Sequence, residues 1–223
     1  PRSTPLYSSA ASDVYKRQAE RRRNEVMIEK VAAARLPTMH GDFEIVGYSS
    51  LIDPGEHMAL VKGEWGPNDA VLVRLLSECL TGNVFSSLRC DCGEQIDRSL
   101  DLITGNKSGV LLYMRQEGRG IGLHNKIRAY SLQDEGMDTI EANEELGFES
   151  DHRHFTTAAQ ILINLGIKKV RLITNNPRKV VALTSHGIEV IERVPIEIEP
   201  NDENRVYLET KRVRMGHLLA NND

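Results

Sequence analysis

The stretch Ala70-Val-Leu-Val-Arg-Leu-Leu-Ser-Glu-Cys79 is a nearly continuous apolar run that ends at the first cysteine of the chain. Such a run is typical of a strand that is buried on both faces of a parallel sheet. A second apolar run, Gly109-Val-Leu-Leu-Tyr-Met114, follows a segment with helical spacing over residues 94–103. This order of strand, helix and strand predicts an α/β fold.

The same alternation continues towards the C-terminus. Expected helices cover residues 123–135, 156–165 and 177–186, and expected strands cover residues 170–174 and 188–194. Two earlier strands, over residues 43–48 and 58–62, are bounded by turn-rich segments and look antiparallel. We therefore predict an α/β layered fold with a mixed, largely parallel central sheet flanked by helices. The tail from Pro200 is charged and has few apolar anchors.

The N-terminal segment divides into two parts. Residues 1–18 show no sustained apolar period, so we expect them to be disordered and dispensable. Because the first methionine is Met27, residues 1–26 either belong to a longer reading frame or are not native, and the first eighteen look like a non-native extension. Residues 19–36 have the spacing of a helix, which Pro37 would end. We place one catalytic domain over residues 19–223.

Composition restricts the class of protein. With 223 residues, 40% of them hydrophobic and 27% charged, the chain suits a globular domain with a substantial core. We expect no membrane span and no signal peptide, and the clustered cysteines favour a reducing cytoplasm. The net charge of −4 argues against nucleic-acid binding. Local clustering of four cations indicates instead a pocket for a small anion; they are Arg115, Arg119, Lys126 and Arg128.

All three cysteines of the chain lie close together in the sequence, at Cys79, Cys90 and Cys92. A turn at residues 81–83 can fold the first thiol back towards the other two. Three thiolates around Zn2+ leave its fourth position open for water, whereas a closed site would need His124 or His152. The alternative is that the cysteines pack as small buried hydrophobes. We favour an open catalytic zinc site.

The segment Arg115-Gln-Glu-Gly-Arg-Gly-Ile-Gly-Leu123 lies between an expected strand and an expected helix. Glycines there let backbone amides approach phosphate oxygens, and a helix N-terminus favours an anion. The spacing is G-x-G-x-G instead of the G-x-G-x-x-G of dinucleotide sites, although Glu141 lies at a suitable distance for a ribose contact. We favour phosphate binding, with a structural tight turn and a dinucleotide site as alternatives.

Two further segments, Asp151-His-Arg-His-Phe155 and Thr174-Asn-Asn-Pro-Arg-Lys179, each lead into an expected helix. The aspartate of the first segment either caps that helix or acts chemically. In the second segment, Asn176 is a suitable N-cap. Arg178 and Lys179 would oppose the helix dipole unless an anion lies nearby.

Taken together, these segments resemble GTP cyclohydrolase II, the zinc enzyme that opens riboflavin biosynthesis. The resemblance covers residues 27–219. It rests on motifs in this order: Ser77-Glu-Cys-Leu-Thr-Gly82, Leu88-Arg-Cys-Asp-Cys-Gly93, Arg115-Gln-Glu-Gly-Arg-Gly-Ile-Gly-Leu123, Asn125-Lys-Ile-Arg-Ala-Tyr130, Asp138-Thr-Ile-Glu-Ala-Asn143, Leu172-Ile-Thr-Asn-Asn-Pro177 and Met215-Gly-His-Leu218. The resemblance implies a homodimer that uses Zn2+ and Mg2+. Its reaction would convert GTP to formate, diphosphate and 2,5-diamino-6-(5-phospho-ribosylamino)pyrimidin-4(3H)-one.

The resemblance also implies roles for individual residues. The implied zinc ligands are Cys79, Cys90 and Cys92. The implied GTP contacts are Arg74, Leu75, Leu76, Ser77, Glu78, Gln95, Glu117, Gly118, Arg119, Thr139, Thr174 and Lys179. The implied catalytic residues are Asp151 as proton acceptor, Arg153 as nucleophile at the α-phosphate, and Tyr130 near the base.

Two points keep alternatives open. A guanidinium stays protonated in proteins, so Arg153 fits an electrostatic clamp on the phosphate more easily than a nucleophile. A zinc-stabilised nucleotide-binding module without turnover is the alternative from a different functional class.

His154 stands where many relatives carry an acidic residue, which affects local pairing around Arg153. Residues 21–25 could end a linker from an upstream dihydroxybutanone-phosphate synthase domain.

Overall fold

The computed structural model describes residues 26–51, 53, 55–149 and 151–219. Within them, the chain forms one sheet of 7 strands in the order β1-β2-β3-β5-β4-β6-β7. The strands are β1 (Ile28–Thr38), β2 (Gly41–Ser50), β3 (His57–Lys62), β4 (Ala70–Ser77), β5 (Gly109–Met114), β6 (Lys169–Ile173) and β7 (Glu189–Val194).

The sheet is mixed and parallel through its central part, which confirms the predicted fold class. β4 pairs in parallel with β5 on one side and with β6 on the other, and β6 pairs in parallel with β7. β1, β2 and β3 form an antiparallel meander that joins the parallel part through an antiparallel pairing of β3 with β5. The early strands are antiparallel, as predicted, and they extend the sheet.

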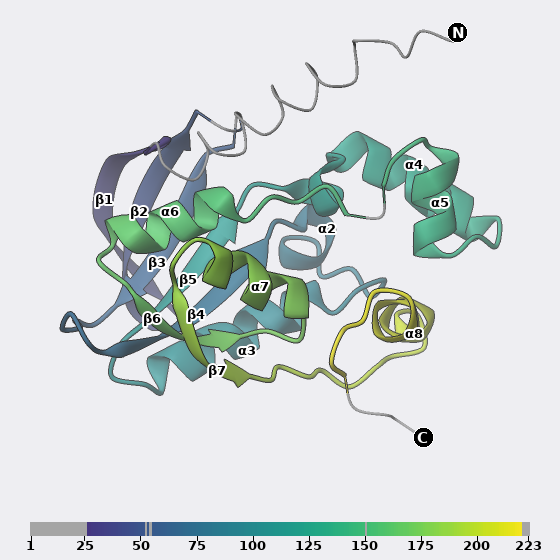
Figure 1. The fold of residues 1–223 in the computed structure, drawn as a ribbon. Coiled ribbons are helices and arrows are strands. Elements are labelled where there is room, and N and C mark those ends of the chain that lie inside the picture. Colours follow the sequence, from purple (N-terminus) through teal and green to yellow (C-terminus); the bar gives the residue numbers. More distant parts are fainter. Residues whose placement is uncertain (1–25, 52, 54, 150, 220–223) are drawn as a thin grey trace, which may run out of the picture.

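Helices cover both faces of the sheet. They are α2 (Leu80–Asn83), α3 (Cys92–Thr104), the 3-10 helix η1 (Glu117–Gly120), α4 (Leu123–Asp134), α5 (Thr139–Glu145), α6 (Thr156–Asn164), α7 (Pro177–Ser185) and α8 (Arg205–Val213). One core cluster joins α6 and α7 to the sheet, and a second joins α3 to the opposite face. Figure 1 shows α4, α5 and α8 at the end of the molecule away from β1. No helix in the described ranges has the length and apolar character to cross a lipid bilayer.

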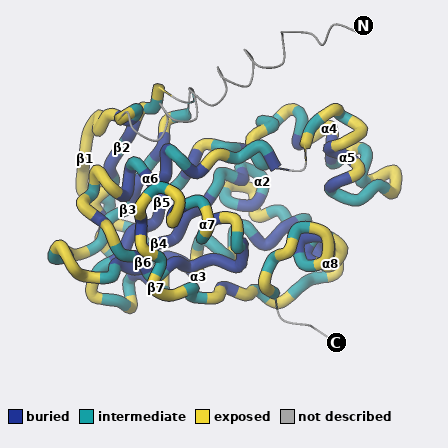
Figure 2. Tube along the Cα trace, in the orientation of Figure 1, coloured by how far each residue is buried: buried dark blue, intermediate teal, exposed yellow. Residues whose placement is uncertain are grey.

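The alternation of side chains along β4 places each residue on one face. Val73 and Leu75 are fully buried in the core beneath α6 and α7, whereas Leu72 packs in the core beneath α3. The face beneath α3 also takes the side chain of Arg74, since successive side chains alternate along a strand. Figure 2 shows the buried central strands in dark blue, surrounded by more exposed segments. A buried guanidinium therefore lies at the carboxyl end of the central strand.

The predicted helix over residues 19–36 is wrong for the part that the structure describes. Residues 28–36 belong to β1, which pairs antiparallel with β2 from Ile28 opposite Ser50 to Thr38 opposite Gly41. β1 is an edge strand with most of its residues exposed, and Val31 is 66% exposed. The helix-like spacing of its apolar residues therefore does not correspond to a buried face. The predictions for residues 1–18 and 19–25 fall outside the described residues.

Candidate active site

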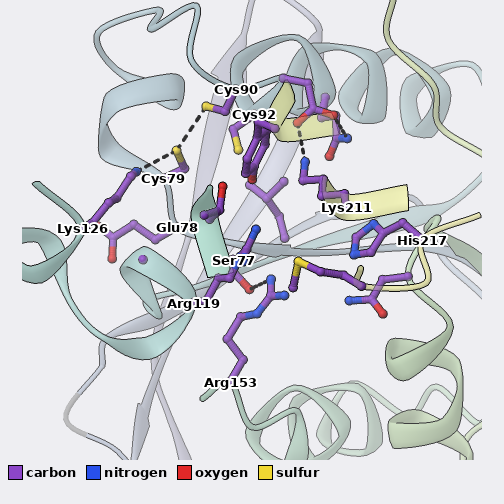
Figure 3. Close-up of a pocket in the computed structure, with 18 of the residues that line it drawn as sticks. Ser77, Glu78, Cys79, Cys90, Cys92, Arg119, Lys126, Arg153, Lys211 and His217 are labelled. Carbon is purple, nitrogen blue, oxygen red and sulfur yellow. Dashed lines mark hydrogen bonds and ion pairs between the residues drawn. The ribbon is translucent and has the colours of Figure 1, made fainter. Parts of the chain in front are cut away.

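The carboxyl ends of the parallel strands meet at one edge of the sheet, where α/β proteins bind ligands. The loops that follow β4, β5 and β6 converge there on one pocket, together with the C-terminal segment. Most of the residues implied by the resemblance line this pocket: Arg74, Leu76, Ser77, Glu78, Cys79, Cys90, Cys92, Gln95, Glu117, Gly118, Arg119, Tyr130, Thr139, Arg153, Thr174 and Lys179. Figure 3 shows how several of them face one another.

Two of the expected residues lie outside the pocket lining. Leu75 is fully buried in the core on the other face of the sheet, so only its backbone approaches the site. Its carbonyl oxygen accepts a hydrogen bond from Nζ of Lys179 at 2.7 Å. Asp151 is buried behind Arg153. Both residues support the pocket from behind its surface.

The three cysteines form a compact cluster. Their Sγ atoms all lie within 4.8 Å of one another, and Cys79 and Cys90 are buried. The expected turn is a single helical turn, α2, and Cys92 begins α3. Gly82 fits tightly against the cluster, because a Cβ there would lie 2.9 Å from Sγ of Cys90. The backbone at α2 is thus shaped to bring the thiols together.

This cluster fits a metal that takes soft ligands in an open site. Among the described residues, the group of potential ligands consists of the three cysteines, and neither His124 nor His152 belongs to it. Hydrogen bonds from Cys90 and Cys92, and then the charge of Lys126, lower the pKa of the Cys79 thiol. The cluster could therefore hold a metal ion through three thiolates and leave a coordination position free.

Lys126 connects the cysteine cluster to the glycine-rich loop. Its Nζ donates hydrogen bonds to Sγ of Cys79 at 3.1 Å, Oγ1 of Thr81 at 3.0 Å and Oε1 of Glu117 at 2.8 Å. Burial opposes the charge of Lys126, but the bond to Glu117 and the charge of Cys79 raise its pKa. Glu117 also accepts a hydrogen bond from the amide of Leu80 at 2.6 Å. The cysteine cluster and the loop are thus held in one hydrogen-bonded unit.

The glycine-rich loop adopts a tight left-handed conformation. The φ angles of Gly118 and Arg119 are 62° and 61°, and that of Gly122 is 83°. Arg119 is one of the few described non-glycine residues with positive φ, and such strain tends to persist at functional sites. Its buried Nη1 has no hydrogen-bond partner among the described residues. The loop therefore presents an unsatisfied cation to the pocket.

Glu141, the candidate ribose contact of the dinucleotide alternative, has a local structural role. Its side chain accepts a hydrogen bond from the amide of Asp138 at 2.9 Å. The side chain of Asp138 accepts hydrogen bonds from the amides of Ile140 and Glu141, which completes a capping box at the start of α5. Glu141 thus caps a helix, and the dinucleotide alternative loses the contact that supported it.

A chain of polar contacts runs along the lining of the pocket from β4 to α8. Arg74 donates to Oε1 of Gln95 at 2.6 Å, and Gln95 donates to Oδ2 of Asp91 at 2.5 Å. Nζ of Lys211 lies 2.7 Å from Oδ1 of Asp91. Burial lowers the pKa of Arg74 to about 10, so this side chain stays cationic at neutral pH. These contacts hold the carboxylate of Asp91, the residue between Cys90 and Cys92 in the sequence.

Asp151 holds Arg153 in one orientation. Its carboxylate accepts hydrogen bonds from Nε of Arg153 at 2.8 Å and from Nη2 at 2.7 Å. Burial alone would raise the pKa of Asp151, but the hydrogen bonds and charge of Arg153 hold it below its usual value. Nη1 of Arg178 lies 3.3 Å from the same carboxylate. Asp151 is therefore the nearby anion that offsets a cation in the first turn of α7.

Lys179 is a buried cation with a backbone partner. Asn176 caps α7 as expected, since its side chain accepts from the amide of Arg178. Burial, followed by the charges of Arg74 and Arg153, lowers the pKa of Lys179 well below its usual value. A buried ammonium among other cations is unfavourable unless an anion compensates it. Its position therefore favours an anionic ligand in the pocket.

Tyr130 lies on α4 beside the cysteine cluster. Its hydroxyl is 3.3 Å from Oγ1 of Thr81, and burial raises its pKa. The charged ends of Arg89 and Lys126 lie 5.0 and 5.6 Å from the centre of its ring. The phenol stays protonated at neutral pH, so it can donate a hydrogen bond to a group bound near the thiols.

Several lining residues were given no role in the site from the sequence, among them Tyr207, Lys211, Met215 and His217. Lys126 also lines the pocket, and the sequence predicted it as one of four cations around a small anion. In all, 7 lining residues are Lys or Arg and 3 are Asp or Glu. Lys126 lies one helical turn before Tyr130 and His217 lies within the motif at residues 215–218, so position relative to known motifs was the available signal. The excess of cations fits a polyanionic ligand.

The protein thus combines an α/β fold, a three-cysteine group that could hold a metal ion and a pocket lined by more cations than anions. A family model described as GTP cyclohydrolase II matches residues 29–195. The chain therefore belongs to the GTP cyclohydrolase II family.

Curated relatives cover most of this chain. The Riboflavin biosynthesis protein RibBA of Chlorobium phaeovibrioides is 52% identical over 198 residues, which are 89% of this chain and 48% of that protein. RibBA of Nocardia farcinica is 54% identical over 206 residues, which are 92% of this chain and 50% of that protein. The chain thus spans about half the length of the curated relatives it matches. RibBX of A. baumannii, a two domain 3,4-dihydroxy-2-butanone 4-phosphate synthase, has 19% identity and a TM-score of 0.47, over 85% of this chain and 49% of that one.

Proposed function

We propose that this chain hydrolyses GTP, opens the guanine imidazole ring and releases formate and diphosphate. The observation that carries the proposal is that the three-thiolate cluster and the cationic residues line one pocket. Guanine would lie at the thiolate end and the triphosphate at the cationic end. The names of the relatives support a place in riboflavin biosynthesis.

The cysteine end of the pocket would carry the ring chemistry. Cys79, Cys90 and Cys92 would hold zinc, which when bound supplies Lewis acidity for hydrolysis at C8 of guanine. Lys126 keeps Cys79 oriented, and its charge favours the thiolate form. Tyr130 stays protonated and donates a hydrogen bond to the base.

The other end of the pocket would carry the phosphorus chemistry. Arg119, Arg153 and Lys179 face the space where the triphosphate would lie. The pair with Asp151 keeps Arg153 charged and fixed, so we assign Arg153 to clamping the phosphorus that water attacks, and Asp151 to positioning Arg153. We further propose that Mg2+ enters with the triphosphate and neutralises part of its charge.

The remaining expectations belong to the same proposal. We propose that residues 19–223 form a single catalytic domain. We also propose that this domain forms a homodimer in the cytoplasm, as the resemblance to GTP cyclohydrolase II implies. Equilibrium sedimentation tests the dimer.

Measuring the two products separately tests the proposed function. The wild-type protein with zinc, Mg2+ and GTP should release formate and diphosphate in equal amounts. Cys90→Ser replaces a soft ligand by a poor one and should release no formate, yet still cleave diphosphate slowly. Arg153→Ala should lose diphosphate release first. Wild-type protein that binds GTP without any turnover would instead be the zinc-stabilised binding module.

A further inference from the structure

The C-terminal segment forms one wall of the pocket. The family match ends at residue 195, whereas six later residues line the site. One is Ile196, and the other five come from α8 and the segment that follows it: Tyr207, Lys211, Met215, His217 and Leu219. The family match does not include α8 and the residues after it, so it assigns no role to this wall of the pocket.

Contacts tie this segment to several loops of the site. Lys211 pairs with Asp91 between the cysteines. The amide of Leu218 donates to the carbonyl oxygen of Asn175 at 2.8 Å, which anchors it to the loop after β6. Arg214 pairs with the carboxylate of Asp138 before α5. The segment is therefore seated against loops from three different parts of the chain.

His217 shares the pocket with several cations. Those whose charges act on it are Lys211 from α8, Lys179 from α7, Arg153 from the loop before α6 and Arg119 from the glycine-rich loop. Figure 3 shows His217 in the pocket with Arg119, Arg153 and Lys211. Burial and then these charges lower the pKa of His217 to about 3. The imidazole is therefore neutral at pH 7 in the free protein.

The positive charge of this corner is only partly compensated. Lys211 and Arg153 pair with the carboxylates of Asp91 and Asp151. Nζ of Lys179 donates a hydrogen bond to the backbone carbonyl of Leu75, and Nη1 of Arg119 has no partner among the described residues. An anion in this corner would compensate the charge of Arg119, favour the ammonium form of Lys179 and reverse the field at His217.

We propose that the C-terminal segment completes the polyphosphate subsite, and that His217 takes up a proton and donates a hydrogen bond to phosphate oxygen when the anion binds. This inference rests on the proposed function, because it concerns the triphosphate end of the same pocket. The bound anion stabilises the imidazolium that the empty pocket disfavours. Binding then becomes tighter as pH falls, since the complex holds one more proton than the free protein.

Titration calorimetry with inorganic triphosphate tests the proposal without requiring turnover. Measurements at pH 6.5 in two buffers of different ionisation enthalpy report the protons taken up on binding. Wild type should take up close to one proton more than His217→Gln. Between pH 7.5 and 6.5, its affinity should rise about tenfold more than that of the variant. His186→Gln, at the end of α7 and outside the pocket lining, should match wild type.

A second variant displaces the segment without touching the imidazole. Leu218→Pro removes the amide that bonds Asn175, and it should weaken triphosphate binding at least tenfold with the same loss of proton uptake. Wild-type affinity and proton uptake in both variants would overturn the inference, as would a wild type that does not bind triphosphate. Proton-coupled triphosphate binding by a wild type that releases no formate from GTP would count against the proposed function alone.

Discussion

Nζ of Lys211 lies 2.7 Å from Oδ1 of Asp91, and both side chains are almost fully buried. The pair joins α8 to the short segment between the second and third cysteines. Removing one member of a buried ion pair leaves the other as an uncompensated charge, which usually costs more than the pair itself contributes.

We therefore expect Lys211→Met to lower the free energy of unfolding by about 3 kcal/mol. Urea unfolding monitored by circular dichroism measures the change. Lys168→Met serves as the control, because Lys168 is exposed and should change stability little. Equal unfolding midpoints for both variants would show that Asp91 finds another partner or becomes neutral at little cost.

Lys126→Met should weaken metal binding by about tenfold, because a group that hydrogen-bonds a metal ligand orients it and stabilises its charged form. Competition with a chromophoric chelator gives the zinc affinity directly. Lys126→Arg retains the charge and should recover part of the affinity. An unchanged zinc affinity in Lys126→Met would restrict this lysine to holding Glu117.

Gly82→Ala should disturb the cluster while leaving the sheet intact. The added Cβ would lie 2.9 Å from Sγ of Cys90 and 2.9 Å from Cβ of Cys92, closer than carbon atoms tolerate. The amount of zinc bound per chain should fall, whereas the far-ultraviolet circular dichroism spectrum should stay like that of wild type. Gly105→Ala is the matched control, because the nearest atom to its Cβ lies 3.4 Å away. Full zinc occupancy in Gly82→Ala would mean that α2 shifts without cost to the thiols.

Tyr130→Phe should lower turnover for formate release about a hundredfold and leave GTP affinity nearly unchanged. The expectation follows from a protonated hydroxyl beside the thiolate cluster, where it can assist the base during ring opening. Steady-state kinetics together with GTP binding separates the two effects. A change confined to KM would assign the hydroxyl to ground-state binding, and unchanged kinetics would leave Tyr130 as a packing residue.

The pair of Asp151 with Arg153 gives a pH dependence with a definite sign. Because the folded pKa of Asp151 lies below its usual value, the pair stabilises the protein above about pH 4, and this contribution is lost as pH falls through the folded pKa. Arg153→Met leaves a buried carboxyl whose pKa rises. Its cost, about 3 kcal/mol at pH 7, should therefore shrink towards pH 4.5. Equal destabilisation at both pH values would contradict this account.

The sheet was predictable where strands are buried on both faces. β4 and β5 carry continuous apolar runs because helices or neighbouring strands cover them, so pattern and burial agree. β1 was mistaken for a helix because only Ile28 of this strand is buried. Its pairing with β2 comes from backbone hydrogen bonds, which leave little trace in the side-chain pattern.

The candidate site was predictable where its residues lie close together in the sequence. The cysteines and the glycine-rich loop carry their spacing within short motifs. The contacts of Lys126 and Lys211 were not predictable in this way. Lys126 reaches Cys79 across 47 positions, and Lys211 reaches Asp91 across 120 positions. No local period reports such a contact, since it depends on how α4 and α8 pack.

The seating of Lys211 on Asp91 also orders events during synthesis. At about 5–20 residues per second, a ribosome adds Lys211 roughly 6–24 s after Asp91. The third cysteine and the strands β5, β6 and β7 are added during that interval, whereas the segment that carries His217 follows it. A chain released early would hold the thiols beside an unfinished phosphate pocket. The segment translated after the cysteines and the sheet therefore decides when the proposed nucleotide pocket becomes complete.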